Sequence, residues 1–172
     1  MKKYSPLVAV SLFALIAASP VLADVNNNTS NIDQIGANLT ATATQGGVGN
    51  TSLSNIDQGL GSPGDNLNAT VTQGGDGTLN EAHIKQNDDD NTGSIDQSGL
   101  VVDNYAFIGQ DGVNNLATII QDGALTENDV EVHQFGTGVL NTATVTQGGN
   151  LNTNVAGVGQ AGSNLHAVIS QH

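Results

Sequence analysis

The side chains with the most regular spacing in this sequence are carboxamides. Successive glutamines are separated by 11, 13, 15, 13, 11, 13, 11, 13, 13, 13 and 11 residues. A carboxamide donates and accepts hydrogen bonds at once, so equivalent amides that stack can form a continuous ladder. Every second gap, starting with 45 to 58, is 13, so a two-part unit of about 24 residues repeats six times, which is typical of a solenoid. The predicted ladder glutamines are Gln34, Gln45, Gln58, Gln73, Gln86, Gln97, Gln110, Gln121, Gln134, Gln147, Gln160 and Gln171.

Other residue types that could carry chemistry lack a pattern. The histidines (His83, His133, His166 and His172) are scattered, and the acidic run Asp88–Asp90 is typical of a solvated turn. The run 74–77 (Gly-Gly-Asp-Gly) is similar to calcium-binding nonapeptide repeats, but no nine-residue period follows it. We therefore expect no catalytic residues, no metal site, no cofactor and no small-molecule substrate.

The residues before each glutamine also repeat. Ile or Val stands two positions before 11 of the 12, and Ala stands four positions before eight of them. Asn stands six positions before eight of them: Asn28, Asn80, Asn91, Asn104, Asn115, Asn128, Asn141 and Asn154. Gly follows two positions after nine of the 11 internal glutamines. The period of two places these side chains on one face of a β-strand.

The charged residues indicate which face is buried. None of the 16 acids, and neither Lys85 nor any histidine, falls on the repeated positions. The inward face is thus small, apolar and amide-bearing. The sequence predicts an all-β fold, a β-solenoid of six two-strand turns with Asn and Gln ladders, rising roughly 29 Å at one strand spacing per turn. Gly after each Gln fits the tight arcs between strands.

Residues 1–23 have the features of a secretory signal peptide. Lys2 and Lys3 precede an apolar stretch from Leu7 to Ala18, and Ala23 ends a small-residue cleavage site. A short segment, 24–27, then leads into the repeats at 28–172, which we divide at 28–45, 46–73, 74–97, 98–121, 122–147 and 148–171. The chain after residue 23 keeps one lysine against 16 acids, a net charge of −15. That charge argues against nucleic acid as a partner, and the lack of cysteine excludes disulfides.

The repeat resembles the curlin repeat of the curli subunits, secreted bacterial proteins that form functional amyloid. The family pattern is Gln-x-Gly followed by Asn-x-Ala-x-x-x-Gln. It is matched by Gln110, Gly112, Asn115, Ala117 and Gln121, by Gln97, Gly99, Asn104, Ala106 and Gln110, and with a longer arc by Gln134, Gly136, Asn141, Ala143 and Gln147. The resemblance covers Asn28 to Gln171. It implies export through the outer-membrane curli pore and polymerisation outside the cell, with roles in biofilm matrix and adhesion.

The resemblance leaves the type of subunit open. A nucleator subunit and secretion accessory proteins are the partners it implies, besides self-association into fibres. We favour a major-type subunit because no Lys or Arg follows Lys85, whereas the nucleator ends in a basic repeat. Six repeats are present where enteric subunits carry five, and the Gly-rich export segment of the major subunit is missing. A third possibility, an ice-binding solenoid with outward Thr rows, is weaker because those rows break at Asp96, Leu116 and Ile120.

The predicted β-solenoid also indicates where subunits would meet in a fibre. The first and last strands are repeat strands with unpaired edges, which are templates for further pairing. Fibre-end contacts are therefore expected at Gln34, Gln45, Gln160 and Gln171, which have a ladder neighbour on one side only.

Overall fold

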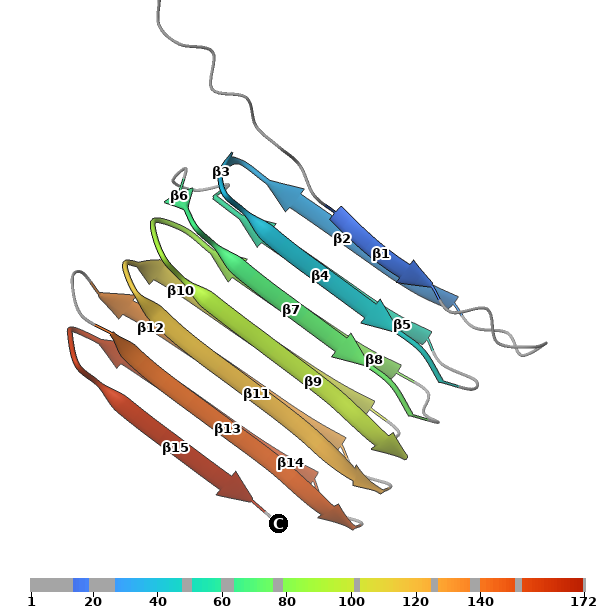
Figure 1. Cartoon of the computed structure of the whole chain (residues 1–172). Helices are drawn as coiled ribbons and strands as arrows, with labels where there is room; N and C mark the ends of the chain where they lie inside the picture. The colour runs from blue at the N-terminus through green and yellow to red at the C-terminus, as the bar shows by residue number, and fades with distance from the viewer. Residues whose placement is uncertain are drawn as a thin grey trace, which may run out of the picture.

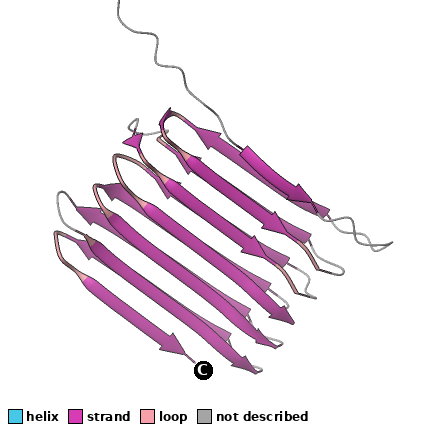
Figure 2. Ribbon diagram, in the orientation of Figure 1, coloured by secondary structure: helices cyan, strands magenta, loops and turns pink. Residues whose placement is uncertain are grey.

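The chain folds into two parallel β-sheets that face each other and wind together as a solenoid (Figure 1). A computed structural model describes residues 14–18, 27–47, 51–59, 64–75, 79–100, 103–124, 127–136, 140–150 and 153–171. The regular structure in these residues consists of strands joined by short turns (Figure 2). Within them, no helix has the length and apolar character that crossing a membrane requires.

One sheet has six strands and the other has seven. The six-stranded sheet consists, from its C-terminal edge, of β14 (Thr153–Ala161), β12 (Glu127–Gly136), β10 (Asp103–Gly112), β8 (Leu79–Gln86), β5 (Thr51–Gln58) and β2 (Asn27–Gln34). The seven-stranded sheet consists of β1 (Ala14–Ala18), β4 (Thr40–Gln45), β7 (Asn68–Gln73), β9 (Thr92–Leu100), β11 (Asn115–Ala124), β13 (Asn141–Asn150) and β15 (His166–Gln171). Two short strands, β3 (Gly36–Ala37) and β6 (Gly64–Asp65), pair in the arcs.

The predicted β-solenoid is confirmed. Apart from β1, β3 and β6, each strand contains one repeat glutamine. These twelve strands form six successive pairs, each with one strand in either sheet, and the chain makes five full turns from the first pair to the last. All pairings are parallel and in register, so Gln58 lies opposite Gln86 and Gln86 opposite Gln110. Register holds although the arcs differ in length, because the extra residues lie between strands rather than within them.

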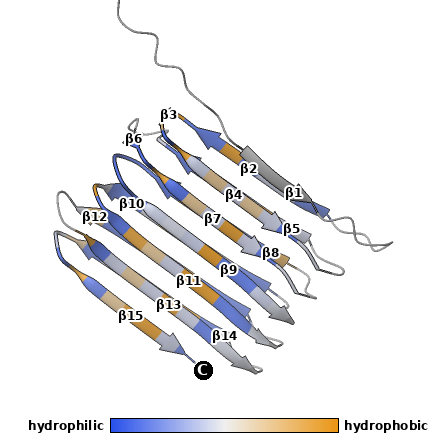
Figure 3. Cartoon of the chain, in the orientation of Figure 1, coloured by the Kyte–Doolittle hydropathy of each residue, from blue (hydrophilic) through white to orange (hydrophobic). Residues whose placement is uncertain are grey.

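The core is one narrow layer between the sheets. From Ala41 to Val158, the Ala, Ile and Val of the repeat are almost completely buried, with Ile56, Ile95 and Ile108 at 0% exposure. Burial alternates from residue to residue along β10, and Figure 3 shows apolar and polar bands crossing the strands. Each fully buried Ile contributes about 1.5–3 kcal/mol of hydrophobic free energy. Small Ala side chains at the mid-strand positions leave the layer thin.

The arcs rely on residues that tolerate positive φ. Left-handed Asn or Asp residues come shortly before the second strand of most turns, at Asn38, Asn66, Asp90, Asn114 and Asn164. After the glutamines, Gly112 has φ of 108°, and a Cβ there would lie 1.8 Å from the carbonyl oxygen of Gly136 in the next turn. Glycine is thus required both by the backbone conformation and by the close stacking of the arcs.

Replacing Gly112 by Ala should destabilise the fold by roughly 2 kcal/mol or more, since it adds strain and a clash with backbone. Gly157→Ala is the matched control, because a Cβ there meets nothing within 4 Å. We expect the control to be neutral or slightly stabilising. Thermal unfolding of the monomer measures both, and equal melting temperatures for the two variants would contradict the stacked-arc explanation.

Candidate functional site

The candidate site is the pair of glutamine ladders inside the solenoid. In the six-stranded sheet, Gln34 Nε2 donates to Gln58 Oε1 at 2.6 Å, and the same bond continues at 2.8–2.9 Å through Gln86, Gln110, Gln134 and Gln160. In the other sheet the ladder runs from Gln45 through Gln73, Gln97, Gln121 and Gln147 to Gln171, at 2.7–3.3 Å. Every predicted glutamine lies in one of these two ladders.

The internal glutamines from Gln58 to Gln134 also bind the opposite sheet. Gln97 Nε2 donates to the carbonyl oxygen of Glu81 at 3.0 Å, and Gln110 Nε2 donates to that of Thr92 at 3.0 Å. Both amide hydrogens and the amide oxygen are thus used, which removes the cost of burying the group. The ladders therefore hold the two sheets together as well as successive turns. These bonds across the interior could not be predicted from the sequence, because the carbonyl that accepts them belongs to no motif.

The asparagine ladders run in the opposite direction. Asn104 Nδ2 donates to Asn80 Oδ1 at 3.1 Å and Asn128 Nδ2 donates to Asn104 Oδ1 at 2.9 Å, towards the N-terminal end. Asn154 continues this ladder, and Asn91, Asn115 and Asn141 form the equivalent ladder in the other sheet. The glutamines donate towards the C-terminal end instead. The side-chain dipoles of the two kinds of ladder therefore oppose each other along the solenoid axis.

The N-terminal end of the six-stranded sheet breaks the asparagine pattern. Asn28 lies opposite Ser52 rather than opposite an asparagine. The hydroxyls of Ser30, Ser52 and Ser54 are buried without a hydrogen-bond partner. The oxygen of Gln34 is also buried without a donor, since this residue begins its ladder. Unmet polar groups thus gather at this end of the molecule.

The outer faces of the two sheets differ in charge. The six-stranded sheet presents most of the charged strand residues, among them Asp57, Glu81, Lys85, Asp129 and Glu131, and none of the acids in the described residues is buried. The other sheet presents mainly Thr and Ser, with Asp96 and Asp122 as the acids at its described outward strand positions from β4 to β15. The predicted outward placement of the charges is confirmed for these residues.

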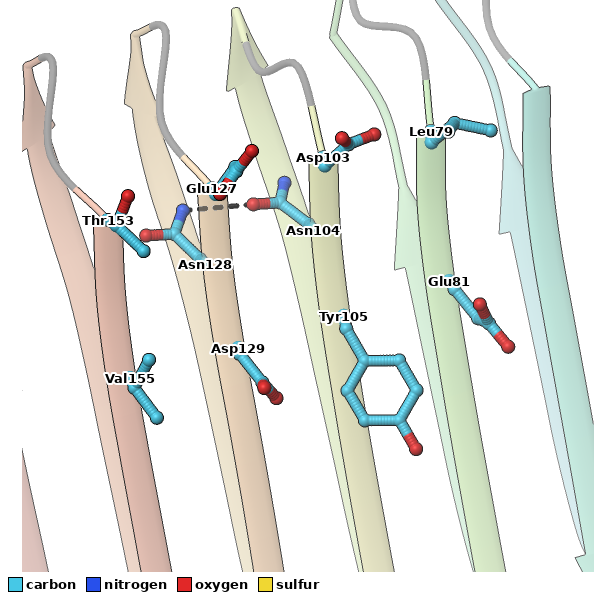
Figure 4. Close-up of a pocket in the computed structure, with 10 residues that line it drawn as sticks. All are labelled: Leu79, Glu81, Asp103, Asn104, Tyr105, Glu127, Asn128, Asp129, Thr153 and Val155. Atoms are coloured by element: carbon cyan, nitrogen blue, oxygen red, sulfur yellow. Dashed lines mark hydrogen bonds between the residues drawn. The ribbon is translucent and has the colours of Figure 1, made fainter.

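A shallow groove of about 400 Å³ crosses the acidic face. In Figure 4, Tyr105 lies between Glu81 and Asp129, below the hydrogen-bonded Asn104 and Asn128 in this view. Burial raises the pKa of Tyr105, and Glu131, Glu81 and Asp129 raise it further. His83 and His133 lie on this same face, near Tyr105 and Phe107 respectively. Among the described residues, no three His, Asp or Glu side chains are grouped so that they could hold a metal ion.

Partial burial raises the pKa of Asp57, and the carboxylate of Asp33, which lies opposite it, raises the pKa further; Lys85 and His83 lower it. A raised folded-state pKa means that ionised Asp57 opposes folding at neutral pH. This penalty disappears as the pH falls through the folded-state pKa.

We therefore expect Asp57→Asn to raise the melting temperature at pH 7 and to leave it nearly unchanged at pH 3, where the carboxyl is already protonated. Asp33→Asn should lower the pKa of Asp57 itself, which NMR titration of the monomer measures. An equal gain in stability at both pH values would show that the ionised form is not the source of the penalty.

Removing a buried, unpartnered hydroxyl should stabilise the protein. Ser54→Ala keeps the small side chain that the repeat uses at this position and removes the unmet group, so we expect a gain of about 1 kcal/mol. Ser94→Ala, on the outer face of β9, is the control and should change stability by less than about 0.5 kcal/mol. Chemical denaturation gives both values, and a loss of stability in Ser54→Ala would mean that the hydroxyl has a partner after all.

Comparison with known sequence families matches the curlin associated repeat three times, at residues 89–123, 102–136 and 141–172. The chain has no match among curated proteins or among solved structures. The matched segments contain the central and C-terminal strands, with their glutamine and asparagine ladders. The repeat motif, the parallel in-register solenoid and the family match agree, and over residues 89–136 and 141–172 the chain is a curlin-repeat protein.

Proposed function

We propose that this chain is a secreted structural subunit that polymerises into extracellular curli-type amyloid fibres, which contribute to biofilm matrix and surface adhesion. Membership of the curlin-repeat family supports an amyloid subunit. The leader at residues 1–23 would direct export, and the curli secretion pore with its accessory proteins would complete it. The main partner is a second copy of the chain, with a nucleator subunit starting the fibre.

The observation that carries this proposal is the complementarity of the two ends. At the N-terminal end, the oxygen of Gln34 is buried without a donor. At the C-terminal end, Gln160 is the last glutamine of the same ladder, in which each preceding amide nitrogen donates towards that end. The nitrogen of Gln160 itself has no further glutamine of this ladder beyond it within the chain and donates to the carbonyl oxygen of Thr142. If β14 of one copy lies against β2 of the next, Gln160 Nε2 meets Gln34 Oε1 and the ladder continues.

The asparagines support the same direction of stacking. Their amides donate towards the N-terminal end, so Asn28 of one copy would donate to Asn154 Oδ1 of the copy before it. Within its own chain Asn28 lies opposite Ser52 and begins no asparagine ladder. A contact between the two ends therefore extends both kinds of ladder, the glutamine ladder that donates towards the C-terminal end and the asparagine ladder that donates towards the N-terminal end. Such a contact is heterologous and does not close, so it produces a fibre.

The charges also favour end-to-end contact. The outward strand residues of β14 are Thr153, Val155, Gly157, Gly159 and Ala161. Those of β15 are His166, Val168 and Ser170, and those of β4 are Thr40, Thr42 and Thr44. On β2, Asp33 is the acid among the outward positions, and it would lie beside Gly159. Most of the acids lie between these terminal strands. Like charges are therefore seldom opposed at the junction, although the chain after residue 23 carries −15.

A major-type subunit is the favoured form of this proposal. A nucleator is the second candidate, but its basic final repeat has no counterpart here, because no Lys or Arg follows Lys85.

Replacing the end glutamines Gln34, Gln45, Gln160 and Gln171 by Ala should slow seeded elongation by roughly tenfold or more. Two ladders are then interrupted at each junction, and a hydrogen bond contributes about 1 kcal/mol. The same change at Gln86, Gln97, Gln110 and Gln121 should mainly lower the stability of the monomer. Thioflavin fluorescence with equal seed and equal monomer measures the rates, and electron microscopy verifies that fibres form.

The two sets of variants serve as each other's control, because each removes four amides. If the internal set slows elongation more than the end set at equal folded fraction, subunits do not add through their terminal strands. Absence of any fibres from the chain without its leader would contradict the proposed function itself.

A further inference from the structure

The leader contains a strand that pairs with the repeats. β1 forms the N-terminal edge of the seven-stranded sheet and pairs in parallel with β4 (Figure 1). Ala14 lies opposite Ala41, Ile16 opposite Ala43 and Ala18 opposite Gln45. The edge of β4, to which a preceding copy would add in the proposed fibre, is therefore occupied in the uncleaved chain.

The register of β1 matches that of a repeat strand. At the other end of the same sheet, Ala167 lies opposite Ala143, Ile169 opposite Val145 and Gln171 opposite Gln147. The segment 14–18 reads Ala-Leu-Ile-Ala-Ala, and 167–171 reads Ala-Val-Ile-Ser-Gln. Ala and Ile thus stand at the same register positions in both strands. The difference is Ala18, which stands where the repeat has its glutamine and which cannot extend the amide ladder.

We propose that β1 takes the place of β15 of a second copy and so blocks end-to-end addition until the leader is removed. This inference rests on the proposed function, because it assumes that β15 of one copy adds to β4 of the next. It adds a role for the leader other than export. The leader keeps the N-terminal acceptor edge covered while the chain is still in the compartment where it is made.

The block acts at one end of the molecule. β2 remains the open edge of the six-stranded sheet, and β14 and β15 remain open at the C-terminal end of the described strands. A copy that still has its leader can therefore attach to a growing fibre through β14 and β15. It then presents a covered β4, so no further copy can add beyond it. Uncleaved chains should act as terminators of that fibre end, even when they are a minor fraction.

The test uses fibre seeds and monomer of residues 24–172, a chain that retains the described core from Ala41 to Val158. Adding the full chain 1–172 at one part in ten should reduce the elongation rate at least about twofold, since each attached copy terminates one end. Full chain with Ile16→Pro should no longer inhibit, because proline removes a backbone donor from β1 and disfavours a strand. Full chain with Ala9→Pro, a leader change outside β1, should inhibit like the unchanged full chain.

A second readout examines the contact in the monomer. Amide hydrogens of residues 42–45 should exchange more slowly in 1–172 than in its Ile16→Pro variant, with β9 to β13 unchanged. If 24–172 forms fibres but 1–172 and its Ile16→Pro variant affect elongation equally, the leader does not cover β4 and the proposed function is untouched. If 24–172 itself forms no fibres, the proposed function and this inference fail together.

Discussion

The structure depends on one constraint, which is that a buried carboxamide must have all its hydrogen-bonding groups satisfied. Each strand of the repeat places a glutamine in a layer that is otherwise made of Ala, Ile and Val. An unpaired amide there would cost at least several kcal/mol per turn. Stacking identical side chains at the strand spacing satisfies one donor and the acceptor, and the opposite sheet supplies a carbonyl for the second donor. Parallel, in-register winding is the arrangement that provides both.

The other features follow from keeping that register. Insertions are confined to the arcs, so Gln58 and Gln86 remain opposite each other although the loop after Gln58 is the longest. Glycines stack where backbone approaches backbone, as at Gly112 over Gly136. Charges stay on the outer faces and are concentrated away from the terminal strands. The constraint is met everywhere except at the ends, where Gln34 keeps an unpaired oxygen, and an unmet ladder end favours a further copy of the same chain.

Most of the fold could be predicted because the repeated Asn, Ala, Ile or Val and Gln residues stand two positions apart in the sequence. The twelve glutamine strands, their buried faces and the outward charges all follow from that spacing and are found in the structure. The bonds from Gln97 and Gln110 to opposing carbonyls could not be predicted, since they depend on how the two sheets are offset. The opposite directions of the Asn and Gln ladders depend on side-chain rotation, which sequence does not specify. The pairing of β1 was missed because an apolar leader predicts export, and its similarity to β15 rests on two residues, Ala14 and Ile16.

The central claim is that copies stack end to end, so that the amide ladders inside one solenoid continue through the fibre. Cryo-electron microscopy of fibres grown from residues 24–172 tests it through the axial repeat of one subunit. Six strand pairs at a spacing of about 4.8 Å predict a subunit repeat of roughly 29 Å, with a two-sheet cross-section that matches a single turn. A subunit repeat of about 4.8 Å, as in fibrils of flat chains stacked one per layer, would contradict the account.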